Sequence, residues 1–416
     1  MTARWLKAVG VLGLVVGLAS CAEATTPEGT DTGIPKPPGP TNPPGPTNPP
    51  GTDDPVIISA PARVAAGGFF TVALRNDGTV WAWGHNGDGQ LGDGTKNTRT
   101  APVQVKGLSG SVTAISIGSY HTVALMNDGT VWAWGDNVSG QLGDGTIYTS
   151  RSTPGRVPGP SGITAISAGW HHAMALANDG TVWAWGANGR GQLGDGNTSP
   201  HITARRIQGL SGVTAISTGS SHTVALKSDG SVWAWGDNSH GQLGDGTTTQ
   251  RTAPVQVQGL SGVAAIAVEG EHTVALKNDG SVWAWGDNVS GQLGDGTRNQ
   301  RTTPVRVQGL SGVTAISSGY RHTVALKNDG SMWAWGSNMD GQLGDGTRYS
   351  RETPVQVQGL SGITGIAAGN NHTVATRNDG TVWTWGHNGF GQLGDGTYPK
   401  IGSHSISPVQ VLDLQL

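Results

Sequence analysis

The sequence has little charge and only one cysteine, and nothing in it reads as a long helix. Charged residues make up 13% of its 416 residues, the formal net charge is −3 and the isoelectric point is near 6.4. A protein that holds phosphate groups usually carries a basic face and a high isoelectric point, so this composition argues against DNA or RNA as a partner. The single cysteine excludes an intramolecular disulfide as a staple for the fold.

Glycine and tryptophan are abundant instead. The chain holds 69 glycines and 16 tryptophans, and glycine does not recur as a collagen triplet. A charge-poor chain rich in these two residues is typical of many short strands joined by tight turns.

The first 55 residues are predicted to lie outside the folded domain. Arg4 and Lys7 precede an apolar stretch, residues 8–18, which is too short to span a membrane as a mature helix. The stretch runs into Leu-Ala-Ser-Cys, which resembles a bacterial lipobox, so residues 1–20 are interpreted as a lipoprotein signal peptide and Cys21 as the lipidated residue. An ordinary signal peptide with an incidental cysteine is the alternative.

The residue after the cysteine bears on localisation. It is alanine rather than aspartate, which by the sorting rule of enteric bacteria implies the outer rather than the inner membrane. We therefore expect a lipid-anchored protein of the bacterial cell envelope, in the outer membrane or at the cell surface.

Residues 21–55 are interpreted as the lipidated cysteine and a proline-rich linker. Residues 22–55 hold eleven of the chain's 22 prolines. Such a segment stays extended as polyproline II, at about 3.1 Å per residue, and has no apolar face to bury. The composition predicts a spacer between membrane and domain, and a tail with no spacer role is the alternative.

Seven copies of one motif fill the rest of the chain. Trp-x-Trp-Gly recurs at intervals of 50 or 51 residues, and Gly-Gln-Leu-Gly-Asp-Gly follows it each time. The motif begins at Trp81, Trp132, Trp183, Trp233, Trp283, Trp333 and Trp383. In the unit 304–346, β-type runs at 304–308, 313–317, 322–327 and 331–336 are separated by turn residues. Four such strands make one blade of a β-propeller.

The two ends of the repeat array predict how the ring closes. The first unit lacks its Pro-Val-x-Val strand and enters at residues 56–66, whereas the last unit is followed by an orphan Pro-Val-Gln-Val at 408–411. We expect the orphan to pair with the N-terminal strands, which would leave no sheet edge open at the closure.

The repeated motifs resemble the regulator of chromosome condensation family. The matching residues are, for example, His-Thr-Val-Ala-Leu from His322, Trp-Ala-Trp-Gly from Trp333, and Asn-x-x-Gly-Gln-Leu-Gly-Asp-Gly from Asn338. The resemblance covers residues 56–416 and implies an all-β, seven-bladed propeller of four-stranded blades, closed by pairing of the N- and C-terminal strands.

Positions identical in every unit are interpreted as architecture. Both tryptophans of each motif point to one strand face and are expected to fill the space between blades. The Asp of Gly-Asp-Gly, and the Gln before it, are expected to bond backbone N–H groups. Six recurrent histidines are interpreted as core residues bonded to backbone rather than as a ring of metal ligands, because the seventh copy is Phe70, which cannot ligate a metal. We expect no metal, no cofactor and no catalytic set.

Positions that differ between units are the candidate site. The pair before the recurrent histidine joins two strands, so seven copies should ring the axis on one face. The candidate ring is Phe69, Tyr120, Trp170, His171, Glu271, Tyr320 and Arg321. Secondary candidates are Arg190, His240 and Phe390 beside the recurrent Asn, and Tyr148 and Tyr349 in the loop after Gly-Asp-Gly. Aromatics and Arg on a rigid scaffold are typical of protein-binding hot spots, and neutral drift in exposed loops is the alternative.

The predicted function is binding rather than catalysis. In fold and in its loop aromatics the sequence resembles the secreted bacterial β-lactamase inhibitory propellers, which implies an envelope lipoprotein that binds a protein and could inhibit it. Glycan binding is the alternative, since aromatic rings suit sugar stacking. Guanine nucleotide exchange, the activity of the family's founding member, needs a cytoplasmic or nuclear GTPase and fits an exported chain poorly. We expect an unidentified protein or glycan partner at the cell surface, membrane contact through the lipid anchor only, and a monomer.

Overall fold

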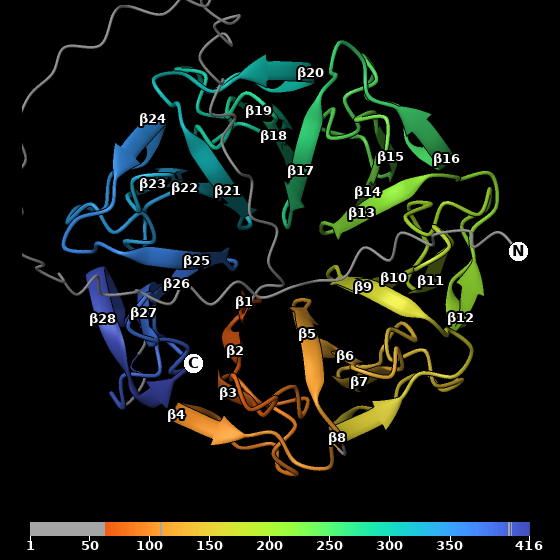
Figure 1. The fold of residues 1–416 in the computed structure, drawn as a ribbon, viewed down its shortest axis with the longest axis horizontal. Helices are drawn as coiled ribbons and strands as arrows, with labels where there is room; N and C mark the ends of the chain where they lie inside the picture. Colours follow the sequence, from red (N-terminus) through yellow and green to blue (C-terminus); the bar gives the residue numbers. More distant parts are fainter. Residues whose placement is uncertain (1–62, 109, 398–399, 401) are drawn as a thin grey trace, which may run out of the picture. The chain divides into compact units, whose positions relative to one another are not determined.

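The computed structural model describes residues 63–108, 110–397, 400 and 402–416. These residues form strands and turns and no helix, so the described part of the chain contains no helix that could cross a membrane. The strands make seven antiparallel, four-stranded sheets that stand as blades around a ring (Figure 1). The all-β, seven-bladed prediction is confirmed. Cys21 and the linker lie outside the described residues.

We number the blades 1 to 7 in chain order. Their first strands are β1 (Val64–Ala66), β5 (Val112–Ile117), β9 (Ile163–Ala168), β13 (Val213–Thr218), β17 (Val263–Val268), β21 (Val313–Ser318) and β25 (Ile363–Ala368). Their second strands are β2 (Phe70–Leu74), β6 (His121–Met126), β10 (His172–Ala177), β14 (His222–Lys227), β18 (His272–Lys277), β22 (His322–Lys327) and β26 (His372–Arg377).

The remaining two strands of each blade carry the Trp-x-Trp-Gly and Pro-Val-x-Val motifs. The third strands are β3 (Val80–Gly84), β7 (Val131–Gly135), β11 (Val182–Gly186), β15 (Val232–Gly236), β19 (Val282–Gly286), β23 (Met332–Gly336) and β27 (Thr381–His387). The fourth strands are β4 (Arg99–Gln104), β8 (Arg151–Arg156), β12 (His201–Arg206), β16 (Arg251–Gln256), β20 (Arg301–Arg306), β24 (Arg351–Gln356) and β28 (His404–Gln415). First strands surround the axis and fourth strands form the rim (Figure 1).

The Pro-Val-x-Val strand lies on a different blade from the one we predicted. It is the fourth strand of the blade before it, where Val103 pairs with Ala82 on the Trp-x-Trp-Gly strand. From the sequence we predicted it as the first strand of the next blade. The structure instead keeps each blade a meander of strands consecutive in the chain, which needs only short local connections.

The predicted closure by pairing of terminal strands is therefore wrong. The orphan segment lies in β28 and pairs with β27 of its own blade, with Val409 opposite Thr384. Blade 1 is complete from β1 to β4. The ring closes by packing instead: Trp83 of blade 1 is buried in one cluster with Val374 and Val411 of blade 7. Its Nε1 donates to the Gln392 carbonyl at 2.9 Å.

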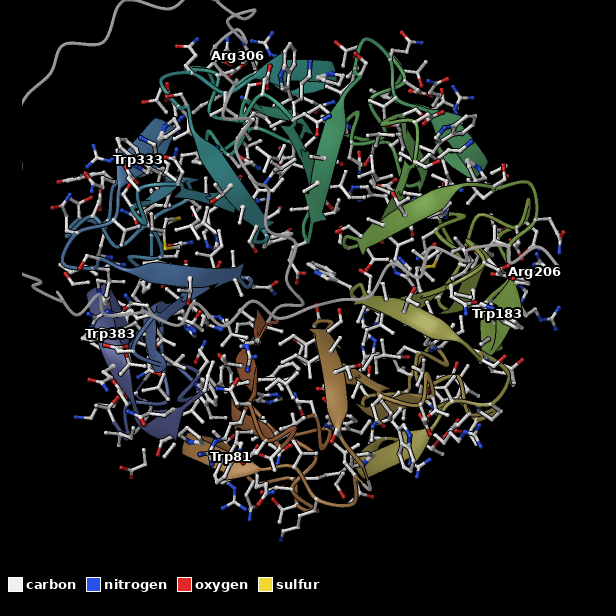
Figure 2. The ribbon with its side chains drawn as sticks, in the orientation of Figure 1. Trp81, Trp183, Arg206, Arg306, Trp333 and Trp383 are labelled. Atoms are coloured by element: carbon white, nitrogen blue, oxygen red, sulfur yellow. The ribbon has the colours of Figure 1, made fainter. Side chains whose placement is uncertain are left out.

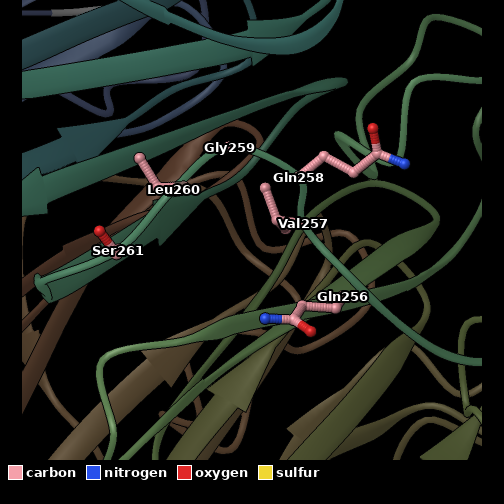
Figure 3. Close-up of a pocket in the computed structure, with 6 residues that line it drawn as sticks. All are labelled: Gln256, Val257, Gln258, Gly259, Leu260 and Ser261. Atoms are coloured by element: carbon pink, nitrogen blue, oxygen red, sulfur yellow. The ribbon is translucent and has the colours of Figure 1, made fainter.

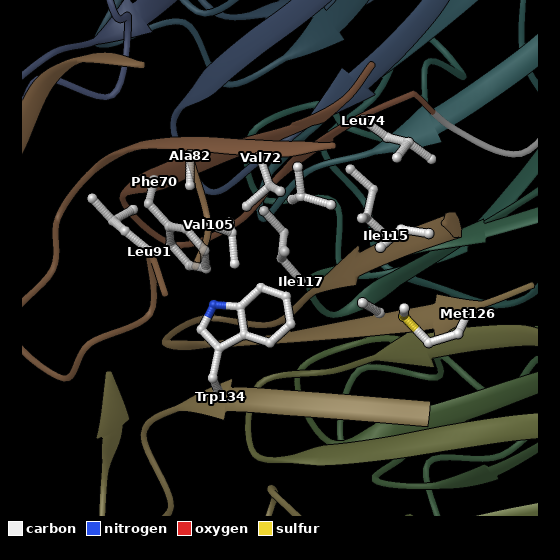
Figure 4. Packing of buried hydrophobic residues seen from close by; sticks show 13 residues of the cluster. Phe70, Val72, Leu74, Ala82, Leu91, Val105, Ile115, Ile117, Met126 and Trp134 are labelled. Carbon is white, nitrogen blue, oxygen red and sulfur yellow. The ribbon is translucent and has the colours of Figure 1, made fainter. Parts of the chain in front are cut away.

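The second tryptophan of each motif holds neighbouring blades together. Trp134 of blade 2 is fully buried against Phe70, Val72 and Leu91 of blade 1 (Figure 4). Its indole N–H donates to the Gln90 carbonyl at 2.9 Å, and the same bond recurs between every pair of neighbouring blades. Gly92 permits this approach, because a Cβ there would lie 2.6 Å from the indole nitrogen. The predicted packing role is confirmed.

The first tryptophan of each motif is half-buried and lies toward the outer part of its blade (Figure 2). Trp132 packs against the cluster between blades 1 and 2, and its Nε1 donates to the Thr130 hydroxyl at 3.3 Å. In five blades a Lys or Arg side chain lies over this ring. The first tryptophan thus joins interior to surface, while the second is wholly interior.

The recurrent histidines are core residues, as predicted, but their partners are not backbone groups. His172 Nε2 lies 3.1 Å from the hydroxyl of Thr223 on the next blade, and four further blade pairs repeat this contact. The Thr223 hydroxyl donates to the Gln192 carbonyl at 2.8 Å, so it accepts from the imidazole N–H. Burial lowers the pKa of His172 to about 3, which keeps the ring neutral.

The Gly-Asp-Gly segments make the predicted turns. Asp93 Oδ1 accepts the backbone N–H of Thr95 at 2.9 Å, and Gln90 Oε1 accepts that of Asp88 at 3.0 Å. Both expectations for these side chains are confirmed. Asp93 also pairs with Arg99 at 2.6 Å, which ties the turn to the fourth strand.

Candidate functional site

Two sets of variable residues meet at one end of every blade. Phe70 pairs with Gly84, so the turn between first and second strands lies beside the start of the connection from third to fourth strand. The backbone N–H of His85 confirms this proximity by donating to the Phe69 carbonyl at 2.9 Å. We call this end of the propeller the turn face. The Asp-Gly hairpins between second and third strands lie at the opposite end, the hairpin face.

The turns form a continuous ring around the axis. The N–H of Asn370 donates to the Gly67 carbonyl at 3.0 Å, and that of Ser220 to the Gly270 carbonyl at 3.1 Å. Trp170 and Tyr320 make the same kind of bond to the next blade at 3.3 Å. The structure thus places the candidate ring residues on one face.

An aromatic cluster covers the turn face over blades 7, 1 and 2. It consists of Phe69, His85, Tyr120, His387 and Phe390. Ring centroids are 5.1 Å apart for Phe69 and Phe390 and 4.9 Å for His85 and Phe390. All five side chains are half-buried, so their rings are supported from below and still reach solvent.

Sequence reasoning missed both histidines of this cluster. They directly follow Trp-x-Trp-Gly, where the other blades carry Asp, Ala or Ser, and that difference was the available signal. The amide nitrogens of Gln90 and Gln392 donate to His85 Nδ1 and His387 Nδ1 at 2.7 and 2.6 Å. Each neutral ring therefore carries its proton on Nε2. Burial lowers the pKa of both histidines, so at neutral pH they are hydrogen-bond donors rather than cations.

Trp170 and Tyr320 meet across the axis. They come from blades 3 and 6, and their ring centroids lie 5.3 Å apart at an interplanar angle of 39°. The Arg321 guanidinium lies 5.1 Å from the Tyr320 ring. These side chains therefore bridge the ring of turns between blades 3 and 6 on the turn face.

Charged residues occupy the turn face over blades 4 to 6. His240 Nε2 lies 3.2 Å from Glu271 Oε2, and Arg321 Nε lies 3.9 Å from Asp287 Oδ2. Burial raises the pKa of Glu271, and the nearby His240 opposes that shift. We call Asp237, His240, Glu271, Asp287 and Arg321 the ionic arc. On blade 3, His171 lies 3.9 Å from Asp136.

Glu269 occupies a position that is glycine in the other six blades. It is 8% exposed, and its Oε1 has no hydrogen-bond partner among the described residues. Burial raises its pKa well above the ordinary value for a glutamate. A buried carboxyl group without a hydrogen-bond partner lowers stability, so Glu269 does not help to hold the blades together.

Three secondary candidates stay apart from these groups. Tyr148 and Tyr349 are 77% and 75% exposed in connections between third and fourth strands, and Arg190 is also exposed. Within the described residues, no ring contact joins either tyrosine to the aromatic cluster. His240 and Phe390, in contrast, belong to the ionic arc and the aromatic cluster.

Two surface hollows lie away from the turn face. One open hollow is lined by the single segment 256–261 (Figure 3), and the next blade repeats it at 306–311. Both lie where a fourth strand leads into the next blade. Equivalent segments of two consecutive repeats line the two hollows, so the hollows are a consequence of the repeat.

Comparison with known proteins agrees with this architecture. The RCC1-like domain model matches residues 37–311, and the regulator of chromosome condensation (RCC1) repeat model matches 329–376 and 379–415. The human probable E3 ubiquitin-protein ligase HERC6 is 38% identical over 134 residues, and the Arabidopsis thaliana ultraviolet-B receptor UVR8 is 36% identical over 137. These matches cover 31% and 32% of this chain but only 13% and 31% of the relatives.

Solved structures share the fold. Human WBSCR16 superposes with a TM-score of 0.71 at 24% identity, over 80% of this chain and 93% of that one. Yeast RCC1 (Prp20), in its complex with Kap60, gives 0.71 at 23% identity, over 86% and 85%. On the seven blades and the family models that span them, this chain belongs to the RCC1-like domain family.

Proposed function

We propose that this protein is a non-catalytic binding scaffold of the cell envelope whose turn face holds a protein partner. One observation carries the proposal: positions that differ between blades gather on one face. Phe69 and Phe390 come from opposite ends of the domain and meet at 5.1 Å. Drift in exposed loops would scatter such residues rather than stack them.

The chemistry of the turn face suits a protein partner. Aromatic side chains offer a large contact area with little rotamer freedom to lose, and they dominate the hot spots of protein interfaces. Here they stand on a frame that is hydrogen-bonded between all neighbouring blades, so binding needs little ordering.

Family members provide a precedent for protein binding. The yeast protein was crystallised with Kap60, and a further structure concerns its binding to Gsp1p and histones. Lipidation of Cys21 would hold this chain at the envelope, and residues 21–55 would let its propeller reach away from the membrane.

A capture experiment tests this function. The full-length protein and its Phe69→Ala, Phe390→Ala double variant are immobilised and exposed to envelope extracts and to secreted proteins. We expect a specific partner to bind the native protein and to be lost from the variant. Tyr148→Ala with Tyr349→Ala is the matched control, because it removes two exposed rings outside the cluster. Equal capture by all three proteins would contradict the proposal.

Glycan binding is the second candidate. The aromatic cluster combines ring faces with two imidazole N–H donors, and a few polar groups among aromatic rings are what orient a bound sugar. A glycan array probed with the native protein and the Phe69, Phe390 variant separates the two functions: binding to a sugar that the variant loses would favour this candidate.

A further inference from the structure

The turn face carries an excess of acidic groups. Its turns, and the residues between Trp-x-Trp-Gly and Gly-Gln-Leu-Gly, hold seven carboxyl groups against two guanidinium groups. The carboxyl groups belong to Asp88, Asp136, Asp237, Glu269, Glu271, Asp287 and Asp340, and the guanidinium groups to Arg190 and Arg321.

The hairpin face, in contrast, neutralises its own acids. Each of its seven hairpins holds one Asp, whose pKa is lowered first by hydrogen bonds from the following Thr or Ser and further by a nearby Lys or Arg. Asp279, for instance, lies near both Lys277 and Arg306. The seven hairpin aspartates equal the turn-face acids in number, so the two faces differ in how many of these acids have a Lys or Arg nearby.

The acids of the ionic arc are held in place with little cationic compensation. Asp287 is almost fully buried, and its Oδ2 accepts the Gln292 amide at 2.9 Å, while Arg321 stays 3.9 Å away. Glu271 meets only the imidazole of His240 within ion-pair distance among the described residues. Glu271 is the partly exposed carboxylate of this pair, and the buried Asp287 lies close enough to add to its negative potential. A carboxylate that lacks a full counter-charge favours a cation supplied from outside.

Glu269, on the same turn as Glu271, adds an unsatisfied polar group rather than a charge, because burial raises its pKa. Its carboxyl group is more than nine-tenths buried, and Oε1 has no partner within the described part of the chain. The blade that carries this unsatisfied acid is also the blade that carries Glu271 and Asp287.

We propose that the turn face binds a basic segment of a partner protein. An apolar side chain of that segment packs on the aromatic cluster, and a Lys or Arg side chain lies over the ionic arc. The Trp170–Tyr320 pair lies between these two groups and continues the aromatic surface, with Arg321 marking the limit of the acidic region. This inference rests on the proposed function and adds the charge of the partner.

Two peptides that differ only in charge test it. Acetylated, amidated Lys-Leu-Lys-Phe-Lys-Leu and Glu-Leu-Glu-Phe-Glu-Leu are fluorescently labelled, and their binding to the full-length protein is followed by anisotropy. We expect the basic peptide to bind at least about tenfold more tightly at low salt, and this preference to shrink as salt screens the charges.

Charge-removing variants locate the effect. The Asp237→Asn, Glu271→Gln protein should bind the basic peptide several-fold more weakly. The Asp229→Asn, Asp279→Asn protein loses two charges on the hairpin face of blades 4 and 5, and should bind as the native protein does. Thermal melts confirm that each variant is folded.

The outcomes separate this inference from the proposed function. Tighter binding of the acidic peptide, binding of neither peptide, or equal losses in the two double variants would overturn the basic-segment inference. The proposed function would survive those results if capture of a cellular partner still depended on Phe69 and Phe390, and it fails only when that dependence is absent.

Discussion

The surfaces between blades and the turn face are made from the same seven repeats, yet they follow opposite rules. Between blades, one indole N–H to glutamine carbonyl bond recurs seven times at 2.9 Å. On the turn face no two blades present the same side chains. Repetition builds a rigid ring, and divergence at the strand ends builds a surface with distinct aromatic and acidic regions. The predictions below test this division, from the largest effect to the smallest.

Acid should unfold the ring through the histidines between blades. Burial lowers the pKa of five of them to about 3 and that of His272 to about 4. In the unfolded chain they titrate near 6.5, so below that pH the unfolded state binds more protons and stability falls as pH falls. Each histidine contributes up to about 1.4 kcal/mol per pH unit. Melting temperatures that stay level from pH 7 to pH 4.5 would contradict the neutral core.

Truncating one aromatic side chain between blades and one on the turn face should give unequal losses of stability. Trp285→Ala removes a fully buried ring and its bond to the Gln242 carbonyl, and should cost about 3–5 kcal/mol of unfolding free energy. Phe390→Ala removes a half-buried ring on the turn face and should cost about 1 kcal/mol or less. Denaturant titration measures the unfolding free energy of both variants. Similar losses would show that the turn face contributes to stability as much as the contacts between blades do.

Replacing Glu269 by glycine should stabilise the protein by about 1–3 kcal/mol, because it removes a buried carboxyl group without a partner. The change gives blade 5 the Gly-Gly turn of blade 1. Because the pKa of Glu269 is raised in the folded protein, the folded state is favoured most below the unfolded pKa of about 4.5. The free energy of unfolding then falls as pH rises toward the folded pKa. The difference in unfolding free energy between the variant and the native protein should therefore grow with pH. A less stable variant would show that Glu269 stabilises the fold.

Ala173→Thr should repair the one histidine contact that blade 3 lacks. Both ring nitrogens of His121 are buried without a partner among the described residues, because blade 3 carries Ala173 where the six other blades have threonine. The new hydroxyl should accept from His121 and donate to the Gln141 carbonyl, as Thr223 does with its equivalents. We expect a gain of about 1 kcal/mol in thermal or denaturant unfolding. Thr223→Ala, which orphans His172, is the opposite control.

Much of the architecture could be predicted from the chain alone. Fifty-residue spacing gave seven blades, because each blade is a local meander whose strands and turns are coded within one unit. The burial of the second tryptophans and the bonding of Asp93 and Gln90 also followed from local pattern. The boundaries between blades could not be predicted in this way, because a continuous array of repeats has no marked beginning. Our predicted blades therefore began one strand too early.

The sequence by itself determined the number of blades, the strands within them and which positions vary. Only the tertiary structure decided how the ring closes. It also decided that threonine hydroxyls rather than backbone groups accept the hydrogen bonds of the histidines, and that Phe69 and His85 of blade 1 contact Phe390 of blade 7. These contacts all run between blades. Neighbouring blades touch through side chains whose separation in sequence carries no local signal, and closing the ring brings the two ends of the domain together.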